Sequence, residues 1–141
     1  MAGTEPQPTL ERLDDTDLTL SNIEDDVRGR DVVDRDGEPV GKVEGLFIDR
    51  EECRVRLLEV SSGGFLGIGK TIQLVPVDAV IAVSVDVVQV EQDREHVARG
   101  PGYDPDLARR EPPRYFADIY GYYGAAPYWT AGYTPPRFPY R

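Results

Sequence analysis

Residues 31–48, with the sequence DVVDRDGEPVGKVEGLFI, decide the fold of this chain. Two apolar stretches flank the polar residues 35–38 (RDGE), in which Gly37 can take a positive φ without steric cost. This pattern predicts a β-hairpin. Gly41 and Gly45 interrupt its second strand, and glycines inside a strand usually mark a bulge or a sharp bend. We therefore expect the hairpin to belong to a strongly curved sheet.

Further short strands follow the hairpin. Residues 53–60 alternate apolar and polar side chains after a polar turn at residues 49–52. The remaining strands are predicted from short β-branched runs at residues 71–76, 81–85 and 87–90. Six short strands, with glycines at the bends and no long helix between them, predict an all-β fold, a small closed six-stranded β-barrel. Closure would remove the exposed strand edges.

The composition is typical of a globular chain and restricts its chemistry. Of 141 residues, 40% are hydrophobic and 30% are charged, and no apolar run reaches the roughly 18 residues of a membrane span. The net charge of −10 opposes direct binding to nucleic acid, whose phosphates attract basic surfaces. The N-terminus lacks the features of a secretory signal, and a single cysteine, Cys53, suits a reducing compartment. We therefore expect a cytoplasmic protein without membrane insertion.

Composition changes twice along the chain and predicts three regions. Residues 1–22 form an acidic arm with few large apolar side chains, which we expect to be flexible. The spacing Ser21-x-x-Glu24 is that of a capping box and predicts a short helical turn leading into the barrel, residues 23–97. Residues 98–141 hold all eight tyrosines, the single tryptophan and eight of the twelve prolines. Their proline spacing predicts a low-complexity tail without long helices.

The tail is the predicted contact segment, because aromatic side chains combine a large contact area with few rotatable bonds. The side chains expected to touch a partner are Tyr115, Phe116, Tyr120, Tyr122, Tyr123, Tyr128 and Trp129. A second interpretation stays open, in which the aromatic tail packs on the barrel and stabilises it, since a domain of about 70 residues buries little surface of its own. The two interpretations differ in whether Arg109 and Arg114 are open to proteolysis.

Residues 64–71, GFLGIGKT, fit the phosphate-binding expression G-x-x-x-x-G-K-T. That motif needs a helix after the loop, with its N-terminal amides facing the phosphates. The residues that follow are β-branched and include Pro76, which predicts a strand. We interpret the segment as a structural loop that seals the barrel, made up of Gly63, Gly64, Phe65, Leu66, Gly67, Ile68 and Gly69. Nucleotide binding through Gly64–Thr71, with Lys70 on the phosphates, is the weakest alternative.

The titratable residues do not indicate an active site. Cys53 and His96 are the only cysteine and the only histidine, so one chain cannot assemble a multi-histidine or multi-cysteine metal site. Asp78 lies among apolar residues, and we expect it to cap a turn at residues 77–80 through backbone amides. His96 follows the last strand in a hydrophilic stretch and is expected on the surface. We predict that the protein is not an enzyme and uses no catalytic residue, cofactor or metal.

Three blocks, in this order, resemble the PRC-barrel family: residues 27–43, 63–70 and 74–80. The resemblance covers about residues 23–97. It implies a six-stranded β-barrel related to the cytoplasmic domain of the photosynthetic reaction centre H subunit and to the C-terminal domain of a ribosome maturation factor. It implies a scaffold for protein contacts and carries over no active site. The chain departs from both relatives, since it lacks the transmembrane helix of the first and the N-terminal domain of the second. Its residues 101–107 (PGYDPDL) and its aromatic tail are similar to the ends of stand-alone bacterial members.

These observations predict a non-enzymatic adaptor whose barrel binds a protein partner of unknown identity, or a second copy of the chain as a homodimer. The aromatic tail would add contacts, because protein interfaces favour aromatic side chains. The alternative is a ribosome-maturation-type factor that binds a ribosomal protein and not RNA directly.

Overall fold

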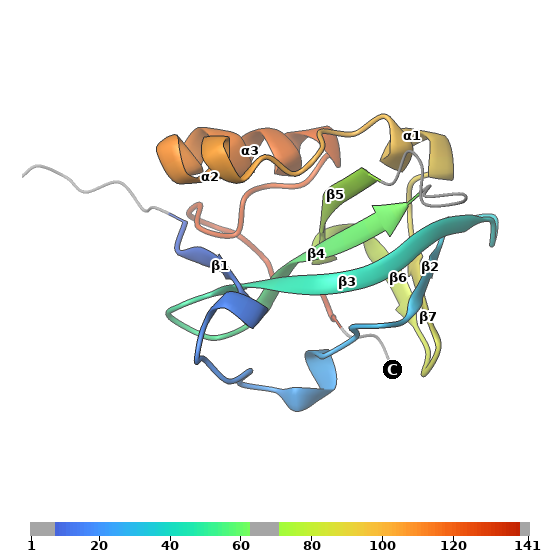
Figure 1. The fold of residues 1–141 in the computed structure, drawn as a ribbon, viewed down its shortest axis with the longest axis horizontal. Coiled ribbons are helices and arrows are strands. Elements are labelled where there is room, and N and C mark those ends of the chain that lie inside the picture. Colours follow the sequence, from blue (N-terminus) through green and yellow to red (C-terminus); the bar gives the residue numbers. More distant parts are fainter. Residues whose placement is uncertain (1–7, 63–70, 139–141) are drawn as a thin grey trace, which may run out of the picture.

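A computed structural model describes residues 8–62 and 71–138 of the chain. Within these ranges the chain forms one curled sheet, with short helices along one side of it (Figure 1). The strands are β1 (Leu10–Arg12), β2 (Asp31–Val33), β3 (Pro39–Asp49), β4 (Val55–Ser62), β5 (Thr71–Pro76), β6 (Val80–Val83) and β7 (Val87–Val90). The helices are α1 (Arg94–Ala98), α2 (Pro105–Arg110) and α3 (Pro112–Tyr122), and the 3₁₀ turns are η1 (Leu13–Asp15), η2 (Ile23–Asp25) and η3 (Val77–Ala79).

The strand order is β5-β4-β3-β2-β7-β6, and β1 pairs with the C-terminal end of β3. The long strand β3 bends along its length, because its register with β4 shifts between Val43 and Gly45. Gly45 therefore marks the predicted bulge. Gly41 is required for a different reason, the close packing of β4: a Cβ atom at Gly41 would lie 1.9 Å from the backbone oxygen of Ser61.

The predicted hairpin is confirmed. β2 pairs antiparallel with β3, and Gly37 in the turn has a φ of +82°. The buried Asp34 closes the turn, since its carboxylate accepts hydrogen bonds from the backbone N–H groups of Asp36 (2.8 Å), Glu38 (2.9 Å) and Arg94 (3.0 Å). Burial alone would raise the pKa of Asp34, but the donors from Glu38, Arg94 and Asp36 hold it below its usual value. Asp34 thus joins the hairpin to the start of α1.

The six predicted strands are present as β2 to β7, but they do not close into a six-stranded barrel. In the part of the chain that the structure describes, β5 and β6 end the strand order and do not pair with each other. The sheet is a curled half-barrel. The outer edge of β5 is covered by the residues before α2, because Gly102 bridges to Gln73 and the Tyr103 N–H donates to the Ile72 oxygen at 2.8 Å.

Helix α3 contradicts the prediction of a tail without long helices. Pro112 and Pro113 lie in its first turn, where a missing N–H breaks no intrahelical hydrogen bond, and the next proline, Pro127, follows its end. The position of the prolines therefore permits a helix that we did not predict from their number. Its apolar stripe packs into the core through Tyr115, Phe116, Ile119 and Tyr120.

The N-terminal arm also differs from the prediction of a flexible segment. From residue 8 onward it is packed on the sheet: β1 pairs with β3, and Leu13 and Leu20 are each only 8% exposed. A few leucines are enough to order this arm, because β1 pairs with β3 and the leucine side chains pack on the apolar surface of the sheet. The predicted helical turn is present as η2, although Asn22 caps it instead of Ser21, with its Oδ1 accepting from the Glu24 N–H.

Candidate functional site

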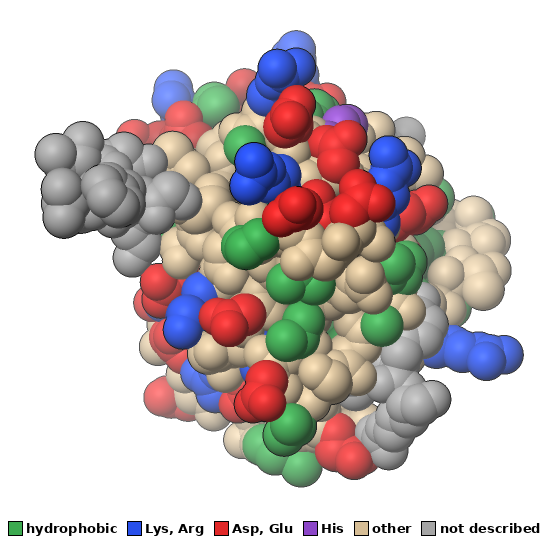
Figure 2. Space-filling model, turned by 90° about the vertical axis from the view of Figure 1, so that its right-hand side faces the viewer, with side chains coloured by type: hydrophobic (Ala, Val, Ile, Leu, Met, Phe, Trp, Pro, Cys, Tyr) green, Lys and Arg blue, Asp and Glu red, His purple; other side chains and the backbone are tan. Residues whose placement is uncertain are grey.

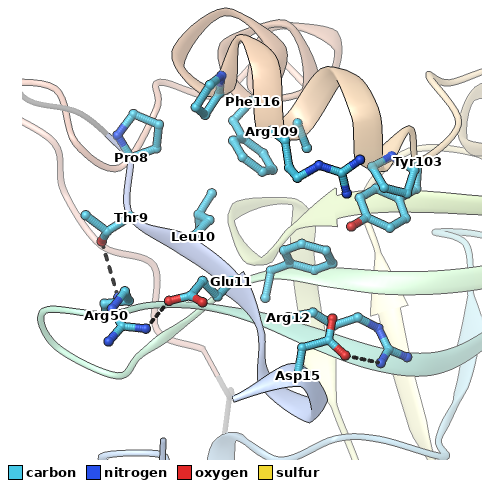
Figure 3. A pocket seen from close by; sticks show the side chains of 14 residues that line it. Pro8, Thr9, Leu10, Glu11, Arg12, Asp15, Arg50, Tyr103, Arg109 and Phe116 are labelled. Carbon is cyan, nitrogen blue, oxygen red and sulfur yellow. Dashed lines mark hydrogen bonds and ion pairs between the residues drawn. The ribbon is translucent and has the colours of Figure 1, made fainter. Parts of the chain in front are cut away.

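An open groove lies between β1 and the helices α2 and α3 (Figure 3). Its volume is about 520 Å³, within the range of ligand-binding pockets. Three segments build this β1–α2 groove: the N-terminal arm, the end of β3, and residues 103–116. The lining residues are Pro8, Thr9, Leu10, Glu11, Arg12, Asp15, Phe47, Arg50, Tyr103, Pro105, Ala108, Arg109, Pro112 and Phe116.

Three aromatic rings form the apolar wall of the groove. The Phe47 ring meets the Tyr103 ring edge-on, with 5.3 Å between centroids, and lies 6.4 Å from the Phe116 ring. The register of β1 with β3 places Phe47 opposite Arg12 and so brings the arm over this wall. Burial, with the nearby Glu59 carboxylate, raises the pKa of Tyr103, so its hydroxyl stays protonated and can donate a hydrogen bond at neutral pH.

Arginines and carboxylates line the rim of the groove. Arg12 donates to Glu59 at 2.9 Å, and this hydrogen bond raises the pKa of Arg12 against the opposing effect of burial. Gly45 leaves the space for that pair, because a Cβ atom there would lie 2.7 Å from Glu59 Oε1. Arg109 pairs with Asp106, but their side chains are 73% and 69% exposed, so the pair is weak and can exchange for another anion.

The seven aromatic residues predicted to contact a partner do not form one surface. Four lie in the core and are at most 9% exposed: Tyr115, Phe116, Tyr120 and Tyr123. Three are half-buried: Tyr122, Tyr128 and Trp129. Of the seven, the groove is lined by Phe116 alone. A buried ring cannot touch a partner without leaving the core, so this arrangement favours the interpretation in which the tail packs on the sheet.

The half-buried tyrosines attach the tail to distant segments. The Tyr122 ring stacks on the His96 ring at 4.2 Å, and its hydroxyl donates to the His96 backbone oxygen at 2.6 Å. We predicted that His96 lies on the surface, but its side chain is half-buried against Tyr122. The Tyr128 ring lies 4.7 Å from the Arg56 guanidinium carbon, and the Tyr128 hydroxyl accepts from the Thr9 N–H at 2.9 Å.

Asp78 does not cap η3 as predicted. The N-cap residue of η3 is Pro76, and no side chain caps the turn. The Tyr133 hydroxyl instead donates to Asp78 Oδ2 at 2.7 Å, which ties the end of the tail to the sheet. Burial raises the pKa of Asp78 and also that of Tyr133. Asp78 is thus a structural anchor for the tail.

Replacing Asp78 with asparagine is expected to remove a loss of stability with rising pH. Because folding raises the pKa of Asp78, the folded state holds the proton more tightly than the unfolded state. The free energy of unfolding therefore falls as the pH rises from about 4, the unfolded value, through the raised folded value. The amide keeps an acceptor for Tyr133 and does not ionise.

Urea unfolding from about pH 4 to about pH 7 checks this expectation. As the pH rises, the free energy of unfolding of the Asp78→Asn variant should increase relative to that of the wild type. Asp118→Asn, at an exposed position on α3, should show the same pH dependence as the wild type. If the free energies of unfolding of Asp78→Asn and the wild type differ by the same amount at every pH, this prediction is wrong.

The predicted structural loop, from Gly63 to Gly69, lies outside the described residues. The structure resumes at Thr71, the last residue of the GKT sequence, and Thr71 begins the strand β5. The chain after the motif is therefore extended, as predicted, and not the helix that a phosphate-binding loop requires. This observation disfavours nucleotide binding.

The β6–β7 hairpin carries exposed apolar side chains that could form a second site. Figure 2 shows the face that lies to the right in Figure 1, where hydrophobic side chains are interspersed with charged ones. The large exposed apolar residues of the β6–β7 hairpin are Ile81, 43% exposed, and Val85, 79% exposed. Single exposed side chains of this kind are ordinary on a monomeric protein. The β1–α2 groove is therefore the candidate site.

The fold and the groove define a small β-sheet protein with helical attachments. Over residues 8–62 and 71–138, no group of three or more His, Cys, Asp or Glu side chains could hold a metal ion. No helix in the same ranges has the length and apolar character needed to cross a membrane.

The model of the PRC-barrel domain family matches residues 24–97, more than half of the chain. The chain therefore belongs to the PRC-barrel family, as its sequence predicted. A comparison with curated proteins found no match. Only Phe47 and Arg50 of the fourteen groove residues lie within the matched range. The β1–α2 groove is thus built almost wholly from segments attached to the family domain.

Proposed function

We propose that this protein is a non-enzymatic adaptor of the cytoplasm that holds a protein partner in the β1–α2 groove. The observation that carries the proposal is the construction of the groove. Segments from both sides of the family domain converge to place three aromatic rings beside three arginines. Aromatic and arginine side chains are the residues that protein interfaces favour and that contribute most to their affinity.

The charges of the groove suit recognition better than catalysis. General acid–base catalysis usually needs a buried acid or base, and a guanidinium does not deprotonate near neutral pH. The two carboxylates that line the groove, Glu11 and Asp15, have side chains that are 39% and 70% exposed. The rim arginines are also ion-paired: Arg12 with Glu59, Arg50 with Glu11, and Arg109 with Asp106. Paired charges at the edge of an apolar wall orient a partner and select it by charge.

Photo-crosslinking in living cells tests the proposal. A photoreactive phenylalanine analogue at Asp15 should yield a discrete crosslinked protein, because this side chain lines the groove and is 70% exposed (Figure 3). The same analogue at Arg35, a 60% exposed residue in the hairpin turn, is the matched control and should not yield it. The captured protein, once identified, should bind the purified full chain. Identical products from both positions, or none from Asp15, would argue against the proposal.

The identity of the captured protein also decides between the partner classes. A ribosomal protein, with the chain co-sedimenting with small-subunit precursors, would support the ribosome-maturation alternative. A product formed from two copies of the chain would make the partner a second copy.

A further inference from the structure

Residues 125–138, which follow α3, form a C-terminal strap that side chains hold against the rest of the protein. The strap contains no helix or strand. Trp129 packs edge-on against the Tyr120 ring of α3, with 5.9 Å between centroids, and Tyr133 bonds to Asp78 in η3. The C-terminal strap is therefore attached at separate points, and it can detach without breaking a strand ladder or a helix.

Asp78 has fewer hydrogen-bond donors than the buried carboxylates of Asp34 and Asp49. Asp34 accepts from three backbone N–H groups, and Asp49 accepts from an arginine and a backbone N–H. Asp78 accepts from the Tyr133 hydroxyl at 2.7 Å, through Oδ2. Its Oδ1 atom is buried and accepts no well-formed hydrogen bond from a described residue. A buried carboxylate needs donors in place of water, so this site suits the neutral carboxylic acid.

The charged and titratable side chains that act on Asp78 are Tyr133 of the strap, Arg56 of β4 and Tyr120 of α3. Burial raises the pKa of Asp78 and outweighs the Tyr133 hydrogen bond, the N–H of Asp78 itself and Arg56, which all favour the charged form. The Arg56 guanidinium is already paired with Asp49. Burial also raises the pKa of Tyr120, so its hydroxyl stays protonated and adds no charge.

Detachment of the strap would return the carboxyl group of Asp78 to water. The neutral acid can still accept the Tyr133 hydroxyl through its carbonyl oxygen, so protonation is compatible with the attached strap. In the detached state the pKa of Asp78 returns to the ordinary value of about 4. The attached state therefore holds the proton more tightly, and the free energy of detachment falls as the pH rises from about 4 through the raised value.

We propose that Asp78 is a pH-dependent latch for the C-terminal strap: the protonated side chain holds the strap in place, and ionisation of Asp78 favours its detachment. Detachment would expose the Tyr120 ring, which Trp129 covers, and the Arg56 guanidinium, which lies 4.7 Å from the centre of the Tyr128 ring. This inference goes beyond the proposed function and does not depend on what the β1–α2 groove binds.

Hydrogen exchange in the full ¹⁵N-labelled chain, measured from about pH 4 to about pH 7, tests the latch. The exchange rate of each amide, divided by the rate of an unprotected amide at the same pH, gives its opening constant. Two amides report on the strap: Tyr133, bonded to the Thr130 oxygen, and Thr9, which donates to the Tyr128 hydroxyl. Leu58, in β4 between β3 and β5, reports on global unfolding.

In the wild type, the opening constants at Tyr133 and Thr9 should rise several-fold over this pH range and should exceed the constant at Leu58 throughout. In Asp78→Asn they should not change with pH, because the amide does not ionise. Asp118→Asn, at an exposed position on α3, should behave as the wild type. Tyr133→Phe keeps the carboxyl group but removes its donor, and it should raise the opening constant at Thr9 about fivefold or more at neutral pH.

Four results would overturn the latch. Equal opening constants at Leu58 and at the strap amides would show that the strap detaches only when the whole chain unfolds. Unprotected strap amides at the lowest pH would show that the strap is not held at all. A wild type without the rise, or a rise that persists in Asp78→Asn, would remove Asp78 as its cause. Unchanged exchange at Thr9 in Tyr133→Phe would show that the bond to Asp78 does not hold the strap.

Discussion

Replacing Arg56 with alanine is expected to lower the free energy of unfolding by about 3–5 kcal/mol, because it leaves a buried carboxylate without its partner. Arg56 Nε donates to Asp49 Oδ2 at 2.7 Å, and the two side chains are 8% and 1% exposed. Asp49 Oδ1 would still accept a hydrogen bond from the Glu52 N–H, but the buried charge would have lost its arginine. The variant also loses the contact of the guanidinium with the Tyr128 ring, which holds the tail.

Urea denaturation measures the effect, and two further variants separate its causes. Arg35→Ala removes an exposed arginine that lies 4.0 Å from Asp93, and it should change the free energy of unfolding by at most about 0.5 kcal/mol. Asp49→Asn combined with Arg56→Met should cost less than Arg56→Ala alone, since no buried charge is then left unpaired. If Arg56→Ala costs no more than Arg35→Ala, the buried ion pair does not stabilise the fold as described.

The features that could be predicted from the sequence are those set by neighbouring residues. Residues 35–38 carry their own turn chemistry, and the strands β2 to β7 carry their own alternation or β-branched runs. Pairing between distant segments has no such local signal. The sequence of residues 10–12 does not indicate that they pair with residues 47–49, and the sequences of β5 and β6 do not indicate that these two strands remain unpaired with each other. The strands were therefore predicted correctly, but the half-barrel and the packed arm were not.

Most of the candidate site was missed for the same reason. The sequence indicates a contact role for Phe116, but it indicates only a strand position for Phe47 and no role in a site for Tyr103 or Arg109. The groove exists because segments separated by tens of residues meet at the end of β3. One local signal was available: Pro112-Pro113 stands just before aromatic residues at helical spacing, which is typical of a helix that begins with proline and packs by one face.

Replacing Gly41 with alanine is expected to lower the free energy of unfolding by about 3 kcal/mol or more. The added Cβ would lie 1.9 Å from the Ser61 oxygen and 2.8 Å from the Ser61 carbonyl carbon. Both are backbone atoms, so no side chain can rotate to relieve the contact. β3 and β4 would have to separate where Lys42 pairs with Ser61, next to Gly41. Urea or thermal unfolding gives the change in stability.

Gly121→Ala is the matched control, because it adds the same methyl group with the opposite expected sign. Gly121 lies inside α3 and nothing is within 4 Å of its added Cβ, so alanine should stabilise the protein by about 0.5–1 kcal/mol through its higher helix propensity. A Gly41→Ala variant as stable as the wild type would show that β4 does not approach β3 this closely. If Gly41→Ala lowers the free energy of unfolding and Gly121→Ala raises it, the loss at Gly41 comes from the close contact between β3 and β4. The propensity difference between glycine and alanine is too small to cause a loss of this size.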